Sequence, residues 1–178
     1  MDAELKNKIE AFAGDVLLVY GISSPIRDMK EVVQKIGGVL IEDESMTPFA
    51  NGTVQKECNG EVKFSIRIPK LMPDSRKNFV VAKCLGKLFL FMGYAVNEDL
   101  WNSENWKNAS EGDFLNFEIR ANEFAAAFLM PREEYRKVLR EYTKENQAYL
   151  KPIADYFNVS QGDVSFRGEE LEMLDPFR

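Results

Sequence analysis

Residues 76–94 read RKNFVVAKCLGKLFLFMGY, a nearly continuous apolar run that carries Lys83 and Lys87 four positions apart. On a helix these two positions lie one turn apart on the same face. The motif H-E-x-x-H uses this spacing to present two imidazoles to one zinc ion, with the glutamate activating a water molecule. Here the frame at 83–87 is KCLGK, so the spacing is kept and each reactive group is replaced. The stretch predicts a helix with the frame of a metal site but different side chains in it.

The composition favours a single domain over residues 1–178. With 45% hydrophobic residues the chain is long enough for one full core, but too short for two ordinary domains. Its 23 Lys plus Arg against 29 Asp plus Glu give a net charge of -6, which leaves no broad cationic surface for nucleic acid or anionic lipid. Direct binding to nucleic acid is therefore not expected.

The sequence contains no segment typical of secretion or of a membrane span. Its first twenty residues mix charged and apolar side chains, unlike a secretion signal. The longest apolar run, 88–96, is well short of the roughly 20 residues that cross a bilayer. Cys58 and Cys84 are too few for a disulfide scaffold or a cysteine zinc site, and they fit a reducing compartment. We expect a cytoplasmic protein without a membrane partner.

The first part of the chain changes from helical to strand periodicity. Residues 1–37 have helical spacing, and we expect a second helix with Pro25 in its first turn and Gly37 closing it. Residues 38–70 alternate instead and contain an Asn59-Gly60 turn signal. They predict a small antiparallel or mixed sheet of about three strands.

The second part of the chain is helical. Residues 73–131 predict two long helices with a polar connection between them, and 132–178 predict further helices. The whole pattern is that of a mostly helical α+β fold.

Three ordered segments resemble one known family. The stretch 76–94 keeps the register of R-x-F-T-x-A-H-E-L-G-H-x-x-L-H outside the reactive positions. EIRANEFAAAFLMP at 118–131 resembles E-x-E-A-N-x-F-A-A-x-L-L-M-P, and IADYFNVS at 153–160 resembles a closing segment of the same family. Together they resemble the ImmA/IrrE-type zinc-metallopeptidase family, as a degenerate member that lacks the H-E-x-x-H residues.

The resemblance implies a zincin-like metallopeptidase fold whose zinc is held by two histidines and a glutamate. In this sequence Lys83 and Lys87 stand at the histidine positions, and Cys84 stands at the general base. Glu118 matches the third ligand. We interpret residues 73–131 as a two-helix core with a degenerate active site.

Two residues near Glu118 complete the comparison. Asn122 lies one turn further on, where the resemblance implies a supporting residue. Arg120 replaces the second acid of the motif, and we expect it at the rim of the cleft or outside it. The chain contains no histidine, so no other imidazole substitutes for the missing ligands.

Lysines are poor zinc ligands because an ammonium group has no lone pair. Removing its proton at neutral pH costs about 1.36 kcal/mol for each of roughly three to four pKa units below its reference value near 10.4. The base that would deprotonate water is also missing. We therefore expect no zinc, no other metal and no cofactor.

Two arrangements of the lysines remain open from sequence. In one, an ammonium group occupies the former zinc position and pairs with Glu118, which keeps a buried carboxylate satisfied. In the other, Lys83 and Lys87 both extend to solvent along an exposed helix edge.

Cys84 also has two interpretations. Flanking lysines favour a thiolate nucleophile, but its apolar neighbours and the lack of a histidine favour a buried, inert thiol. We adopt the second interpretation and assign no catalytic residue.

The resemblance implies a regulatory context. Family members typically cleave a helix-turn-helix transcriptional repressor, often within a prophage, mobile element or stress operon. Our leading hypothesis is a catalytically inactive pseudopeptidase that binds such a partner protein without cutting it. The alternative is an active peptidase of the family with non-standard chemistry. We expect the peptide to add to an edge strand that carries Phe64, Ile66 and Ile68, and we predict no oligomeric state.

Overall fold

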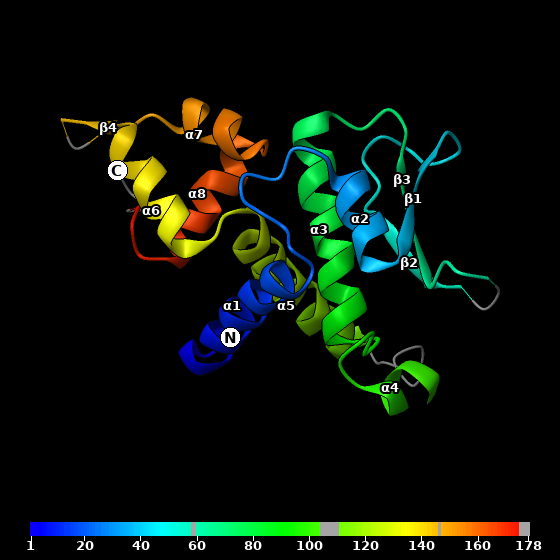
Figure 1. Cartoon of the computed structure of the whole chain (residues 1–178). Coiled ribbons are helices and arrows are strands. Elements are labelled where there is room, and N and C mark those ends of the chain that lie inside the picture. Colours follow the sequence, from blue (N-terminus) through cyan, green and yellow to red (C-terminus); the bar gives the residue numbers. More distant parts are fainter. Residues whose placement is uncertain (58–59, 104–110, 146, 175–178) are drawn as a thin grey trace.

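The computed structural model describes residues 1–57, 60–103, 111–145 and 147–174, and it is mostly helical with a small mixed sheet (Figure 1). The predicted α+β class is confirmed. In chain order the elements are α1 (Ala3–Val19), α2 (Met29–Ile36), β1 (Gly38–Asp43), β2 (Thr53–Lys56), β3 (Phe64–Pro69), α3 (Asp74–Leu90), α4 (Glu98–Ser103), α5 (Glu111–Leu129), α6 (Arg132–Glu141), β4 (Thr143–Lys144), β5 (Gln147–Ala148), α7 (Leu150–Phe157) and α8 (Gln161–Glu170).

The main sheet has the strand order β1-β3-β2. Strand β1 runs parallel to β3, with Gly38 opposite Phe64, and β2 runs antiparallel to β3, with Lys56 opposite the same residue. The sheet is therefore mixed. A parallel neighbour needs a crossover connection whereas an antiparallel one does not, and here β2 and its flanking loops supply the crossover between β1 and β3.

This order corrects the expected peptide-binding edge. Strand β3 is the central strand, and Phe64, Ile66 and Ile68 are fully buried. Both backbone edges of β3 are occupied by its neighbours, so it has no free edge to pair with a peptide. The alternation of apolar and polar residues in this segment identifies a buried face of the strand. It carries no information about which strand lies at the edge of the sheet.

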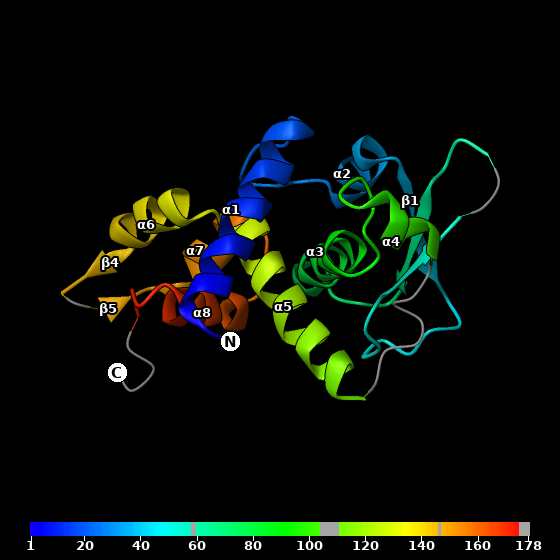
Figure 2. The same cartoon turned by 90° about the horizontal axis from the view of Figure 1, so that it is seen from below.

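Helix α3 lies between the sheet and α5 (Figures 1 and 2). It packs on β2 and β3 on one side and makes its most extensive contact with α5 on the other. Gly86 permits this close approach, because a Cβ atom there would lie only 3.1 Å from the Cβ of Phe124 and 3.2 Å from the Cα of Ala121. The backbone of α3 is thereby held directly against α5.

The start of α2 differs from the sequence prediction. The helix begins at Met29, where the Asp28 side chain accepts hydrogen bonds from two backbone N–H groups and caps it. Pro25 lies before the helix and not in its first turn. Gly37 ends the helix as predicted, in the left-handed conformation with φ of 103°.

The C-terminal helices are fixed to the rest of the fold by Arg167 on α8. This side chain is buried, and its guanidinium donates to the carbonyl of Met130 at 2.9 Å and to Glu10 on α1 at 2.7 Å. Ser160 caps α8 in a reciprocal capping box with Asp163. Within the part of the chain described, no helix is long and apolar enough to cross a membrane.

A buried carboxyl group lies where α5 meets α8. Glu123 is 8% exposed, and burial together with a hydrogen bond to Glu170 raises its pKa from 4.5 to about 7. Between these two values the folded protein binds more protons than the unfolded chain. Stability therefore falls as the pH rises through this window.

We predict that Glu123→Gln stabilises the protein by about 3 kcal/mol at pH 8, because the amide carries no charge to bury. The gain should shrink toward pH 5, where wild-type Glu123 is largely protonated. Urea unfolding at both pH values measures it, with Glu133→Gln, at an exposed carboxylate paired with Arg136, as control. An equal gain at the two pH values would contradict the assignment.

Candidate functional site

The candidate site begins on α3, whose apolar residues are almost all buried. Lys83 lies among them, and its side chain is only 10% exposed. Lys87 follows one turn later with its side chain 25% exposed. The i, i+4 spacing thus places one nearly buried and one half-buried ammonium group on the same face of the helix.

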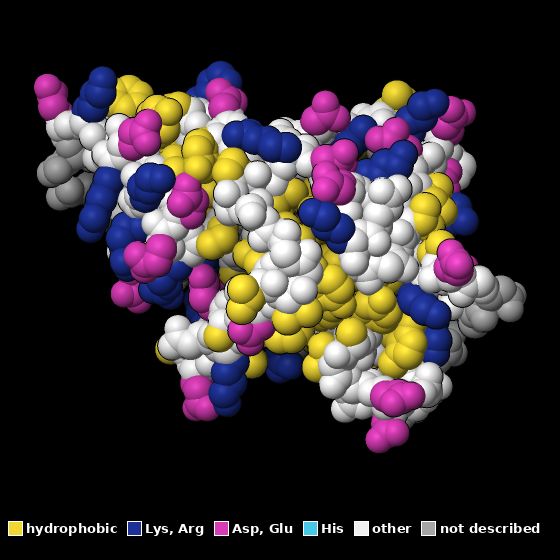
Figure 3. Space-filling model, in the orientation of Figure 1, with side chains coloured by type: hydrophobic (Ala, Val, Ile, Leu, Met, Phe, Trp, Pro, Cys, Tyr) yellow, Lys and Arg dark blue, Asp and Glu magenta, His cyan; other side chains and the backbone are white. Residues whose placement is uncertain are grey.

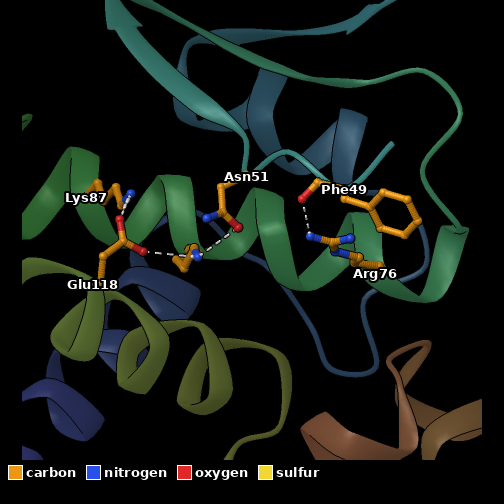
Figure 4. A network of polar contacts seen from close by, with 6 residues as sticks. Phe49, Asn51, Arg76, Lys87 and Glu118 are labelled. Atoms are coloured by element: carbon orange, nitrogen blue, oxygen red, sulfur yellow. Dashed lines mark hydrogen bonds and ion pairs between the residues drawn. The ribbon is translucent and has the colours of Figure 1, made fainter. Parts of the chain in front are cut away.

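Both ammonium groups meet a single carboxylate on α5. The Nζ of Lys83 lies 3.1 Å from Oε2 of Glu118, and the Nζ of Lys87 donates a hydrogen bond to Oε1 of the same group (Figure 4). Each carboxylate oxygen therefore receives one lysine. The structure shows the pairing arrangement and not the alternative in which both lysines extend to solvent.

The loop between β1 and β2 adds a third partner. The side-chain oxygen of Asn51 accepts from Lys83 at 3.4 Å, and Arg76 donates to the carbonyl of Phe49 at 2.8 Å (Figure 4). Gly52 follows, and a Cβ atom there would lie 3.0 Å from the Sγ of Cys84. The loop therefore runs along α3, and the Asn51 side chain and the Phe49 carbonyl accept hydrogen bonds from cationic side chains of that helix.

The electrostatics of Glu118 reflect its two partners. Burial raises the pKa of this carboxyl, but hydrogen bonds from Lys87 and Lys83 and their positive charges outweigh burial, so the pKa lies below its usual value. The group is ionised at neutral pH. The site therefore consists of one charged carboxylate and two charged ammonium groups.

Cys84 does not join this cluster. It is fully buried, and burial raises the pKa of its thiol to about 12, although Lys87 and Lys83 oppose the rise. A thiol with this pKa is protonated at neutral pH and has no solvent access, so it is not a nucleophile. The interpretation as a buried, inert thiol is the one that the geometry supports.

The donor set does not fit a zinc ion. Lys83 and Lys87 offer protonated nitrogens at two of the three ligand positions, and Glu118 offers the remaining carboxylate, already bound by both. Structural and catalytic zinc sites use cysteine, histidine and carboxylate ligands. Within the described residues, no group of three or more His, Cys, Asp or Glu is placed to hold a metal. No chemical step is therefore assigned to a metal here.

The remaining predicted residues lie outside the cluster. Asn122 lines a separate hollow with Lys6 of α1 and Phe166 of α8. The expected support of Glu118 by Asn122 stays a prediction, because Asn122 lines this hollow whereas Glu118 lines a different pocket together with Lys87. Arg120 is half-buried on the same helix.

Asn51 was missed from sequence. It sits in a loop without periodicity, where neither spacing nor the resemblance marks a position. The sequence signal that can reveal the loop is the Asn51-Gly52 pair, which is typical of turns and loops.

The comparisons with known proteins agree with this architecture. A peptidase family model described as the IrrE N-terminal-like domain matches residues 38–167. No curated protein gives a match. Among solved structures, a Mycobacterium tuberculosis transcriptional regulator is similar, with a TM-score of 0.60 and 16% sequence identity over 90% of this chain. At that identity the likeness concerns the fold alone, and this chain spans 46% of the regulator's length.

We predict that the ion pairs are coupled. Glu118→Ala leaves Lys83 nearly buried without its carboxylate and should lower the free energy of unfolding by about 2 kcal/mol. Adding Lys83→Met, which keeps the apolar stem, should recover at least half of the loss. Urea unfolding of the two single variants and the double variant gives the coupling energy.

Glu31→Ala serves as the matched control, because its carboxylate pairs with Lys35 on an exposed helix face. That substitution should cost less than about 0.5 kcal/mol. Strictly additive effects of Glu118→Ala and Lys83→Met would show that the observed ion pair contributes nothing.

Proposed function

Since the chain belongs to the IrrE N-terminal-like family of peptidases, we propose that it acts without catalysis, by binding a partner protein. The observation that carries the proposal is the double ion pair of Lys83 and Lys87 with Glu118. Two fixed ammonium groups supply the positive charge that the carboxylate needs. A divalent cation would either have to displace both of them from Glu118 or remove their protons to use them as ligands.

The state of Cys84 adds support. At the position that the resemblance assigns to the general base, the structure has a buried thiol whose pKa is raised to about 12. Such a group takes no proton from water at neutral pH. Hydrolysis by the family mechanism thus lacks both the metal ligands and the base, and the alternative of a non-standard peptidase finds no nucleophile at this position.

The regulatory part of the proposal rests on two observations. The similar solved structure is described as a transcriptional regulator, which supports a regulatory context for this fold. The face in Figure 3 has Lys and Arg interspersed with Asp and Glu around a central area of hydrophobic side chains. This surface suits a protein partner better than the phosphates of nucleic acid. A helix-turn-helix repressor is the partner that we propose.

The corrected strand order supports β2 as the position at which that partner binds. Strand β2 lies at an edge of the sheet, next to α3. An extended segment of the partner adding to this edge would pass the lysine pair. Binding there needs no chemistry from the site.

We predict that the purified protein contains well below one zinc per chain, even when it is produced with added zinc. The variant with Lys83→His and Lys87→His restores two imidazoles beside Glu118 and should bind about one zinc per chain. Inductively coupled plasma mass spectrometry measures both. Adding Glu118→Gln to the double variant removes the third ligand and should abolish binding, whereas stoichiometric zinc in the wild type would overturn the proposal.

We further predict that a helix-turn-helix repressor encoded beside this protein forms a complex with it and stays intact. Size-exclusion chromatography detects the complex, and mass spectrometry of the repressor after incubation with zinc detects any cut. A cleaved repressor would contradict the non-catalytic function. Absence of a complex would contradict the proposed partner.

A further inference from the structure

A small pocket lies beside the lysine pair. Its volume is about 210 Å³, and it is bounded by α3, the first half of α5 and the start of β2. The described lining is mostly apolar and includes Val54, Phe91, Met92 and Phe117, and its charged residues are Lys87 and Glu118. The rings of Phe91 and Phe117 contact each other with centroids 4.1 Å apart. A pocket of this size is below the range of sites for drug-sized ligands and suits one or two side chains.

Among the residues that the structure describes, the charges at this pocket do not balance. Lys83 and Lys87 together carry two positive charges, and Glu118 supplies one negative charge to both. Lys87 reaches the pocket and is part exposed, so its ammonium group, which has three N–H donors, has donors to offer a ligand. One more carboxylate from a ligand would neutralise the cluster.

The position of β2 restricts the form of such a ligand. Gly52 and the first two residues of this edge strand, Thr53 and Val54, line the pocket, and the strand continues to Lys56. A peptide paired with this edge would run past the pocket and direct alternate side chains toward it. Two side chains that point the same way are two positions apart in such a peptide.

We propose that the site selects an extended segment of its partner with an internal acidic residue two positions from an aromatic residue. This inference rests on the proposed function. The acidic side chain accepts from Lys87, and the aromatic ring enters the pocket against Phe91 and Phe117. The recognised chemistry is a side-chain carboxylate, and Glu118 limits the positive charge that attracts it.

Blocked hexapeptides test this selection. ATDTFT carries the acidic and aromatic residues, ATNTFT replaces the acid by its amide, and ATDTAT removes the ring. Fluorescence anisotropy should show ATDTFT binding about fivefold more tightly than ATNTFT, which is the effect of one partly exposed ion pair. ATDTAT should also bind more weakly. Equal affinities for ATDTFT and ATNTFT would overturn the proposal.

Variants of the site should change the preference for ATDTFT over ATNTFT in opposite directions. Lys87→Met should abolish the preference for the acid over the amide, and Glu118→Gln should increase it by about threefold, because one negative charge is removed. Lys35→Met, on the exposed face of α2, is the matched control and should change nothing. Thermal unfolding by circular dichroism verifies that each variant is folded. A preference that survives in Lys87→Met would overturn the proposal.

Two outcomes separate this inference from the proposed function. A peptide with its carboxylate only at the C-terminus that binds more tightly than ATDTFT would overturn the internal-acid selection alone. If the zinc-free protein binds an intact repressor but none of the peptides, the internal-acid selection is likewise overturned and the proposed function stands. Cleavage of a peptide would instead overturn the non-catalytic function.

Discussion

The contact between two ammonium groups on α3 and one carboxylate on α5 is the interaction on which the site depends. Lys83 is nearly buried, and a buried charge is tolerated only with a partner of opposite sign. Glu118 is that partner, and it also receives Lys87. Gly86 lets the two helices approach closely enough for these side chains to meet. The packing of the helix pair and the charge pattern of the site are therefore one constraint, and a change in either affects the other.

In the proposed function, fixed side chains stand in place of a divalent ion, and this changes what the site can do. A metal ion polarises a carbonyl and activates water, whereas protonated lysines supply hydrogen bonds and positive charge. The same positions then favour the recognition of anionic groups over hydrolysis. The buried thiol of Cys84 is consistent with this change, since it lies without access to solvent at the position that the resemblance assigns to the general base. These side chains support the function that we propose, in which the protein holds a segment of a partner without cutting it.

Much of this arrangement was predictable from sequence, and the failures have physical causes. The i, i+4 spacing placed Lys83 and Lys87 on one face, and the resemblance identified Glu118 as their neighbour. Periodicity reports which face of an element is buried, so it found the strand with Phe64 but not that strand's place in the sheet. Asn51 comes from a loop, and only the tertiary structure brings it to Lys83. Local patterns thus predicted elements and faces, whereas strand order and loop contacts depend on long-range packing.

Anomalous diffraction from a crystal soaked in zinc tests the central claim most directly, because it locates the metal and the lysine nitrogens in one experiment. Data collected above and below the zinc absorption edge should show no anomalous peak between α3 and α5. The nitrogens of both lysines should remain within hydrogen-bonding distance of the Glu118 carboxylate. A zinc peak at about 2 Å from Glu118 and from a lysine nitrogen would contradict the replacement of the metal by fixed charge.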